Sequence, residues 1–286
     1  MCLNYHLGYN ELIRTNNLCV GKSWLDGCVL QLFEIILLMI IIGLAAGIFG
    51  SIVGVGGGII MTPALTFLGF PPAQIASTSL IAVTFGSSSS TMAYARQKRI
   101  QYQIGIKIAA SAIPGAIVGA YLSSYLALDA FKIIFAIILL ITGLYIIQPS
   151  SIKEDRVKKI SRASMLFTYA IGFVAGTVSS LFGIGGGIVF VPVLVVILGI
   201  PMFKASPTSQ LAVFITSVAG SITHSLLAHP DYTLAVFLSA GATIGGQIGA
   251  KISYRVKESL LRKVLFISLF LVAARLIFDV LHKPSS

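Results

Sequence analysis

The stretch FGSIVGVGGGIIMTPALTFLG, residues 49–69, interrupts a hydrophobic run that is long enough to cross a membrane. It places Gly-Val-Gly-Gly-Gly at 54–58 and a proline at 63, where an unbroken helix would otherwise continue. Relative to alanine, glycine destabilises the interior of a helix by roughly 1 kcal/mol and proline by about 3 kcal/mol. Something in the fold or the function of the protein must compensate for these residues.

The composition is that of a membrane protein. The 286 residues are 56% hydrophobic and 10% charged, with a mean hydropathy of +0.95, whereas about a quarter of the residues in a soluble domain are charged. The formal charge of +11 is carried by short loops between apolar runs. That placement is typical of a protein embedded in a lipid bilayer and argues against nucleic acid as a partner.

Ten apolar segments are predicted to be helical. Two of them, 59–68 and 188–198, are too short to cross a bilayer at 1.5 Å per residue. The eight longer segments are 30–53, 75–95, 104–126, 130–147, 163–181, 205–227, 233–254 and 260–281. We therefore predict an all-α polytopic membrane protein with about eight spanning helices and two short, broken or re-entrant helices.

The chain also contains a tandem duplication. The stretch SLFGIGGGIVFVPVLVVILG at 180–199 repeats the opening motif 129 positions later. With one inserted residue the register continues at an offset of 130, so that Thr78-Ser79 recurs as Thr208-Ser209. Chance does not maintain such a register over about eighty residues. The predicted parts are a polar extension at 1–29, a first repeat at 30–148, a basic linker at 149–162 and a second repeat at 163–281.

The basic residues predict the orientation of the helices. If the helices alternate, most of the 20 basic residues fall on one side, in loops near Arg99 and Arg255 and in the linker at 149–162. By the positive-inside rule this side is cytoplasmic, and both termini are external. Each repeat then crosses the membrane an odd number of times, which makes the two repeats inverted, an architecture of many secondary transporters. An even number of crossings would make them parallel.

Two interpretations of the glycine clusters are weighed. Glycines allow helices to pack closely. They can also unwind a helix near the middle of the bilayer, so that free N–H groups and the positive end of the next short helix face an anion. A break that recurs in both repeats favours the second interpretation. The candidate substrate-binding glycines are Gly56, Gly57, Gly58, Gly185, Gly186 and Gly187, with Pro63 and Pro192 as structural helix breaks.

Hydroxyl and amide side chains follow each break. They either cap the next helix or complete the substrate site, and the sequence does not decide between these roles. These residues are Thr78, Ser79, Thr208, Ser209 and Gln210. For His224, late in its helix, a hydrogen-bonded buried or interfacial histidine is favoured over a proton relay. The sequence has no catalytic dyad, no Ser-His-Asp arrangement and no metal-ligand motif, so we expect no enzyme activity, cofactor or metal.

The doubled motif Gly-x-Gly-Gly-Gly-x-x-x-x-Pro, each copy followed by a Thr-Ser pair, resembles the sulfite exporter TauE/SafE family, also called TSUP permeases. The resemblance covers about residues 30–281. It implies a plasma-membrane transporter of small anions, chiefly sulfite, sulfonates and other organosulfur or carboxylate compounds. The chain has no ATP-binding motif, so we expect an ion gradient to drive alternating access. A passive anion channel and a membrane scaffold protein that transports nothing are the alternatives.

Overall fold

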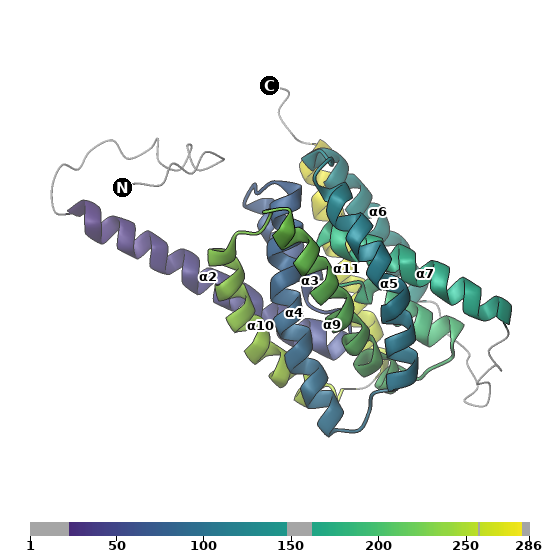
Figure 1. Ribbon diagram of the computed structural model, residues 1–286. Helices are drawn as coiled ribbons and strands as arrows, with labels where there is room; N and C mark the ends of the chain where they lie inside the picture. Colours follow the sequence, from purple (N-terminus) through teal and green to yellow (C-terminus); the bar gives the residue numbers. More distant parts are fainter. Residues whose placement is uncertain (1–22, 148–161, 257, 282–286) are drawn as a thin grey trace.

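The computed structural model describes residues 23–147, 162–256 and 258–281, which form ten α-helices and one π-helical turn (Figure 1). The elements are α2 (Ser23–Val53), α3 (Gly58–Phe67), α4 (Pro72–Arg96), α5 (Tyr102–Ser123), α6 (Leu128–Ile147), α7 (Arg162–Phe182), α8 (Gly187–Pro192), the π-helical turn η1 (Val193–Ile197), α9 (Met202–Leu226), α10 (Tyr232–Ile252) and α11 (Glu258–Leu281). Each of the ten predicted segments is helical, which confirms the all-α fold. The predicted linker, except Arg162 at the start of α7, and most of the polar extension lie outside the described residues. Helix α2 begins earlier than predicted.

The helix lengths agree with the prediction of eight long and two short helices. The eight long helices have from 20 to 31 residues, whereas α3 has 10 and α8 has 6. A helix of 20 residues is about 30 Å long, which matches the hydrocarbon core of a bilayer. The long helices can therefore span the membrane, and the short ones cannot.

The two repeats pack against each other reciprocally. A β-carbon placed on Gly115 of α5 would lie 2.0 Å from the carbonyl oxygen of Phe173 in α7. At the equivalent Gly245 of α10 it would lie 2.3 Å from the carbonyl oxygen of Leu44 in α2. Phe173 and Leu44 are themselves equivalent residues of the repeat. Each small-residue helix face therefore packs closely on the opposite repeat, and the two halves are related by an approximate two-fold axis.

The repeats are inverted, as the charge pattern predicts. The equivalent helices α4 and α9 lie in the middle of the fold (Figure 1). Just beyond the end of α4, Arg99 Nε donates to the carbonyl of Phe203 near the start of α9, 3.1 Å away. Just beyond the end of α9, the amide of Asp231 donates to Thr78 Oγ1 near the start of α4, also at 3.1 Å. Equivalent helices thus run in opposite directions.

The surface of the helix bundle is suited to lipid. Large exposed hydrophobic side chains line α2, α5, α6, α10 and α11. Among the described helices, Phe33–Val53 of α2, α5 and α10 are long and apolar enough to cross a membrane by length and composition. Many serines and threonines of the central helices α4 and α9 are buried inside the protein. Their polar side chains are therefore kept away from the lipid.

Exposed tyrosines mark both ends of the bundle. Tyr102 and Tyr254 lie at one end, and Tyr125 and Tyr232 lie at the other. Tyrosine is enriched where a membrane meets water, because its ring is apolar and its hydroxyl is polar. The two pairs of tyrosines therefore fit the two interfaces of a bilayer.

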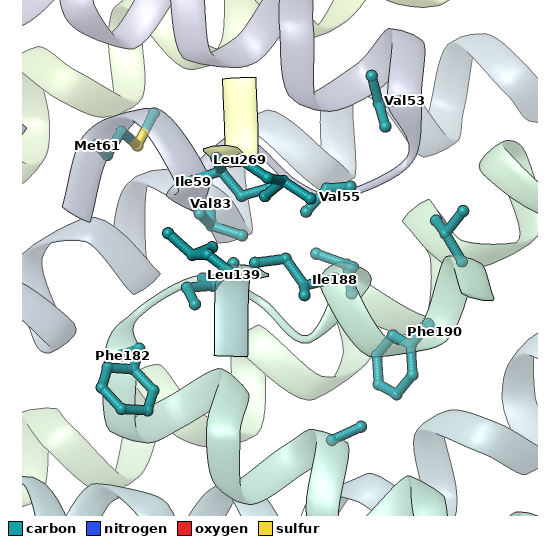
Figure 2. Close-up of a cluster of buried hydrophobic side chains, with 14 of the residues drawn as sticks. Val53, Val55, Ile59, Met61, Val83, Leu139, Phe182, Ile188, Phe190 and Leu269 are labelled. Carbon is teal, nitrogen blue, oxygen red and sulfur yellow. The ribbon is translucent and has the colours of Figure 1, made fainter. Parts of the chain in front are cut away.

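The apolar core surrounds the two helix breaks. Val55 of the first break and Ile188 of α8 enter the same buried cluster as Val83 of α4 (Figure 2). At the end of α7, the ring of Phe182 stacks on that of Phe135, with centroids 5.2 Å apart. Non-helical backbone at membrane depth is tolerated where protein shields it from lipid, and this cluster supplies that shield.

Candidate functional site

Both helix breaks are made of glycines in the left-handed backbone region. Gly54, Gly56 and Gly57 have φ angles of +92°, +89° and +85°. The equivalent Gly183, Gly185 and Gly186 have φ angles of +71°, +90° and +81°. An L-residue with a β-carbon is disfavoured in this conformation by roughly 1–2 kcal/mol. The glycines therefore unwind the chain, as the functional interpretation of the motif requires, and also allow close packing.

The two breaks touch each other at the centre of the fold. A β-carbon on Gly58 would lie 2.4 Å from Cα of Ile184, and one on Gly187 would lie 2.5 Å from Cα of Val55. Both distances are far below van der Waals contact. The N-terminal end of each short helix thus packs backbone to backbone on the opposite break, with no room for a side chain between them.

Two valines fill the remaining space beside the breaks. A β-carbon on Gly56 would lie 2.7 Å from Cγ1 of Val213, and one on Gly185 would lie 2.6 Å from Cγ1 of Val83. Val83 belongs to α4 and Val213 to the equivalent position of α9. In this conformation the centre is closed from both sides by symmetry-related side chains.

Among the described residues, the amides that begin each short helix find no hydrogen-bond acceptor. The first hydrogen bonds to the carbonyl of Gly57 come from Ile60 and Met61, and those to Gly186 come from Val189 and Phe190. Within the described part of the chain, the three preceding amides of each break, at 57–59 and 186–188, donate no hydrogen bond. Unpaired N–H groups are normal at a helix start. Here they lie at the positive ends of α3 and α8, where each helix start is buried against the opposite break.

The carbonyls that end the preceding helices are, in contrast, well satisfied. The carbonyl of Gly50 in α2 accepts from the amides of Gly54 and Val55, both at 2.9 Å. In the second break, the amide of Ile184 donates to the carbonyl of Ser179 at 3.0 Å. The carbonyls of Gly50 and Ser179 are therefore not available to a ligand in this conformation, whereas the unpaired amides at 57–59 and 186–188 can donate to an anion.

The predicted serines lie against the opposite break. Ser209 Oγ donates to the carbonyl of Gly54 at 2.7 Å, and Ser79 Oγ lies 3.0 Å from the carbonyl of Gly183. Gln210 Nε2 donates to the carbonyl of Gly50. These side chains are fully buried. In this conformation they hold the breaks in place, and their contact with substrate stays a prediction.

The predicted threonines hold the loops at the two ends of the fold. Thr208 Oγ1 accepts from the amide of Gln101 at 3.0 Å, just as Thr78 Oγ1 accepts from Asp231. Neither residue is a helix cap. The cap positions are Pro71 and Pro201, and α4 and α9 begin directly after them. The capping interpretation is therefore wrong, because the helices start earlier than the hydroxyls.

The prolines have a smaller role than the sequence suggests. Pro63 lies inside α3, which continues to Phe67. Pro192 is the last residue of α8, and the π-helical turn η1 follows it directly. The helix break is made by the glycines, because their left-handed φ angles redirect the chain before either proline is reached. Pro63 as a helix break is thus corrected.

Sequence reasoning missed two buried hydroxyls beside the second break, those of Ser179 and Ser180. Ser179, Ser180 and Thr216 have buried oxygens with no hydrogen-bond partner, and so does Oε1 of Gln210. Ser179 lies beside the break, since a β-carbon on Gly186 would be 3.2 Å from its Cβ. A usable signal was the repeat itself. Ser180 lies 129 positions after Ser51, and each serine stands three residues before the first glycine of its break.

Arg99 is a second surprise, because the sequence places it in a basic loop. Its side chain is 5% exposed and makes a cation–π contact with Phe203, 3.8 Å from the ring centroid. Its guanidinium donates to the carbonyl of Phe203, to Gln97 and to Ser253. Burial lowers the pKa of Arg99 from its ordinary value, but a guanidinium stays charged at neutral pH. Arg99 therefore joins the loop after α4 to the start of α9 and the end of α10 through charged hydrogen bonds.

No group of three His, Cys, Asp or Glu side chains in the described residues could hold a metal ion. The site consists instead of backbone donors and hydroxyls at two helix breaks, inside an inverted duplication of membrane helices. This combination defines the polytopic membrane transporters with discontinuous helices.

Comparison with known proteins specifies the family. The model of the family described as sulfite exporter TauE/SafE matches residues 39–276, and the chain belongs to this family. It is 31% identical over 265 residues to the probable membrane transporter protein YunE of Bacillus subtilis (strain 168), covering 85% of this chain and 97% of that protein.

More distant relatives carry similar names. The probable membrane transporter protein ORF9 of a Sinorhizobium species is 26% identical over 251 residues, covering 87% of this chain and 95% of that protein. The probable membrane transporter protein MJ0441 of Methanocaldococcus jannaschii is 29% identical over 254 residues, covering 82% of this chain and 93% of that protein. The protein is thus a multi-pass membrane transporter of the TauE/SafE type.

Proposed function

We propose that the protein is a secondary transporter of a small anion, which binds at the contact between the two helix breaks, at the N-terminal ends of α3 and α8. The observation that carries this proposal is the two sets of amides, at 57–59 and 186–188, that donate no hydrogen bond within the described part of the chain. Each helix end stabilises an anion by about 0.3–2 kcal/mol. Two ends together can account for a tenfold or larger gain in affinity.

The unpaired hydroxyls beside the second break support the same proposal. A buried hydroxyl without a partner costs roughly 1–3 kcal/mol. Ser179 and Ser180 bear this cost directly before the glycine motif. An oxyanion has several acceptor oxygens, so it can take hydrogen bonds from these hydroxyls and from the amides together. Ser79, Ser209 and the threonines complete the proposed shell once the breaks rearrange.

Transport requires the two breaks to separate. In the described conformation the breaks are in backbone contact, and Val83 and Val213 fill the space beside them. An anion reaches the amides only when one repeat moves relative to the other. Inverted repeats do this by rocking about a fixed site, which exposes it to each side of the membrane in turn.

The proposed substrate class is sulfite, a sulfonate or another organosulfur anion. The support is the description of the family as sulfite exporters and the unpaired amides and hydroxyls at the breaks, which can donate to an oxyanion. An ion gradient is the proposed energy source. The relatives are named as probable transporters without a substrate, so the choice within this class depends on experiment.

The first test is binding to the purified protein. A specific ligand at 100 times its Kd raises the free energy of unfolding by about 2.7 kcal/mol. We expect sulfite, thiosulfate or a sulfonate to raise the Tm, and short carboxylates to do so less. A panel in which no anion raises the Tm would contradict the proposal.

The second test is uptake of radiolabelled sulfite by proteoliposomes against its own gradient. A coupled transporter accumulates substrate when an ion gradient is imposed, whereas a passive channel only equilibrates it. Gly186→Ala should weaken sulfite binding. Gly69→Ala is the matched control, because Gly69 also has a positive φ of +80° but lies in open space outside the site. Equal binding by both variants would place the anion elsewhere.

A further inference from the structure

Two histidines at the end of α9 form a hydrogen-bonded pair that connects three parts of the fold. Nδ1 of His224 lies 3.1 Å from Nδ1 of His229. Nε2 of His224 lies 3.0 Å from the carbonyl oxygen of Ser180 in α7, and Nε2 of His229 lies 3.1 Å from Oγ of Ser124 after α5. His224 is fully buried, whereas His229 lies in the turn beyond α9.

The partners define one tautomer for each neutral ring. The carbonyl of Ser180 can only accept, so Nε2 of His224 carries the hydrogen and Nδ1 is an acceptor. His229 must then donate from Nδ1, which leaves its Nε2 free to accept from the hydroxyl of Ser124. The four residues form a continuous chain of hydrogen bonds from the end of the bundle to α7.

This series of hydrogen bonds can accept one additional proton but not two. A proton on Nε2 of His229 keeps the bond between the rings, because the hydroxyl of Ser124 can rotate to accept. The bond between the rings then becomes charge-assisted and stronger. A second proton would have to occupy Nδ1 of His224, where it would remove the acceptor and place two cations side by side. The pair therefore titrates as a unit.

Within the described residues, the hydrogen-bond partners of the pair are uncharged. Ser180 from α7 and Ser124 from the end of α5 are uncharged. The nearest acid along the chain, Asp231, accepts from the amides at the start of α10 through Oδ1, and Asp129 at the start of α6 has an interaction of its own. Burial lowers the pKa of His229 from its ordinary value of 6.5. Burial thus favours the neutral form of His229, and further exposure to water would raise its affinity for a proton.

The equivalent residues of the first repeat are Tyr94 and Arg99, 130 positions earlier. The hydroxyl of Tyr94 donates to the carbonyl of Ser51 at 2.7 Å, and Ser51 is the repeat equivalent of Ser180. Each repeat therefore holds the same carbonyl, directly before its glycine break, with a side chain from its central helix. The first repeat uses groups that do not titrate near neutral pH, and the second uses imidazoles.

We propose that His224 and His229 form a binding site for a single proton, which is taken up when this end of the fold opens and released when it closes. The proton is then the coupling ion, an inference that rests on the proposed transport function. The bond from His224 to Ser180 links the site to the second break, which begins at Gly183. Movement of α7 away from α9 breaks this bond and exposes the pair, so proton uptake favours the open state.

The first experiment does not depend on any substrate. The chain has four histidines, so His6→Gln together with His282→Gln leaves the pair as the only imidazoles. NMR of ¹⁵N-labelled imidazoles in the purified protein should show one ring protonated on Nε2 and the other on Nδ1. Acidification should add one proton with an apparent pKa below 6.5. The proposal would be overturned if the two rings titrated independently, each with a pKa near 6.5. It would also be overturned if both neutral rings carried their hydrogen on Nε2.

The second experiment measures coupling in proteoliposomes with sulfite. At one proton per anion, a pH gradient of one unit drives about tenfold accumulation. His229→Gln keeps a donor and an acceptor but cannot be protonated near neutral pH. It should lose the accumulation and keep downhill flux, whereas the control His282→Gln should behave like the parent. Accumulation that survives in His229→Gln would overturn proton coupling at this site.

The two experiments separate failure of this inference from failure of the proposed function. If the parent moves no sulfite under any gradient, the proposed function is contradicted for that anion. The NMR titration then still decides whether the histidine pair binds a single shared proton. If sulfite is accumulated but the histidines titrate independently, the transport function stands and the proton site is rejected.

Discussion

Ser209 donates its hydroxyl hydrogen to the carbonyl of Gly54, 2.7 Å away in the opposite repeat. Its repeat equivalent Ser79 lies 3.0 Å from the carbonyl of Gly183, but it also donates within its own helix to Ile75 at 2.7 Å. Each helix break is therefore held by a side chain from the other half of the chain. The position of each break thus depends on the other repeat.

Loss of these bonds should lower stability to different extents. Ser209→Ala leaves the carbonyl of Gly54 without its side-chain donor and should reduce the free energy of unfolding by about 1 kcal/mol or more. Ser79→Ala should cost less, because Ser79 shares its hydrogen with its own helix. Thermal unfolding in detergent measures both. Ser88→Ala is the control, since Ser88 is only partly buried and bonds within its own helix to the carbonyl of Phe85. A Tm for Ser209→Ala equal to that of the control would contradict the prediction.

Alanine substitutions at the two left-handed glycines should rank in a defined order. At Gly57 the new β-carbon would lie 2.7 Å from the backbone oxygen of Ala46, whereas at Gly186 it would lie 2.9 Å from the ring of Phe190. A ring can shift and a helix backbone cannot, so Gly57→Ala should be the more destabilising variant. Both also carry a strain of about 1–2 kcal/mol for the positive φ.

The ranking is checked by Tm and by yield of monodisperse protein. Gly69→Ala adds the same strain without a steric clash, since nothing lies within 4 Å of its β-carbon position. It should therefore be the mildest of the three. A Gly57→Ala protein that is as stable as Gly69→Ala would show that the close contact of α2 with the first break is not important for stability.

Basic residues should differ strongly in importance. Arg99→Lys should lower the Tm, because lysine cannot reproduce the two bonds to the carbonyl of Phe203 together with the stacking on its ring. Arg275→Gln should have little effect on stability or transport, because Arg275 is 59% exposed and its ion pair with Asp279 is at the surface. Lys107→Gln should likewise have little effect, since Lys107 is exposed. Loss of transport in a folded Arg275→Gln or Lys107→Gln protein would place the anion on a side chain.

The orientation in the membrane can be tested with single cysteines in a background without Cys2, Cys19 and Cys28. A cysteine at Ser151, in the basic linker, should resist a membrane-impermeant thiol reagent in intact cells, because that side is predicted to be cytoplasmic. A cysteine at Tyr125 should react, since Tyr125 is 87% exposed at the opposite end of the bundle. The reverse labelling pattern would invert the topology.

Stability should fall on acidification. The pKa of His229 is lowered in the folded protein, so protonation favours the unfolded state. Its contribution to stability is complete above about pH 6.5, the ordinary histidine value, and is lost as the pH falls through the lower folded value. Tm measured from pH 8 to pH 5 should therefore decrease in the parent and decrease less in His229→Gln. Identical profiles would exclude a shifted His229.

The sequence alone determines the helices, the duplication and the position of both breaks. These features are local or repetitive. Apolar runs of about 20 residues, glycines that cannot sustain a helix, and a register of 129 and 130 positions can all be read without knowing which segments touch. The charge pattern adds the inverted arrangement, because the loops on one side carry most of the basic residues.

Only the tertiary structure decides what the polar residues do. Ser209 and Thr208 follow the same motif, yet one holds the opposite break and the other holds a loop. Arg99 reads as a surface charge and is buried on Phe203, and His224 reads as an ordinary buried histidine and is bonded to His229. The physical reason is that a hydrogen bond or a buried charge depends on its partner, and here the partners lie in other helices, up to some 150 residues away in the chain.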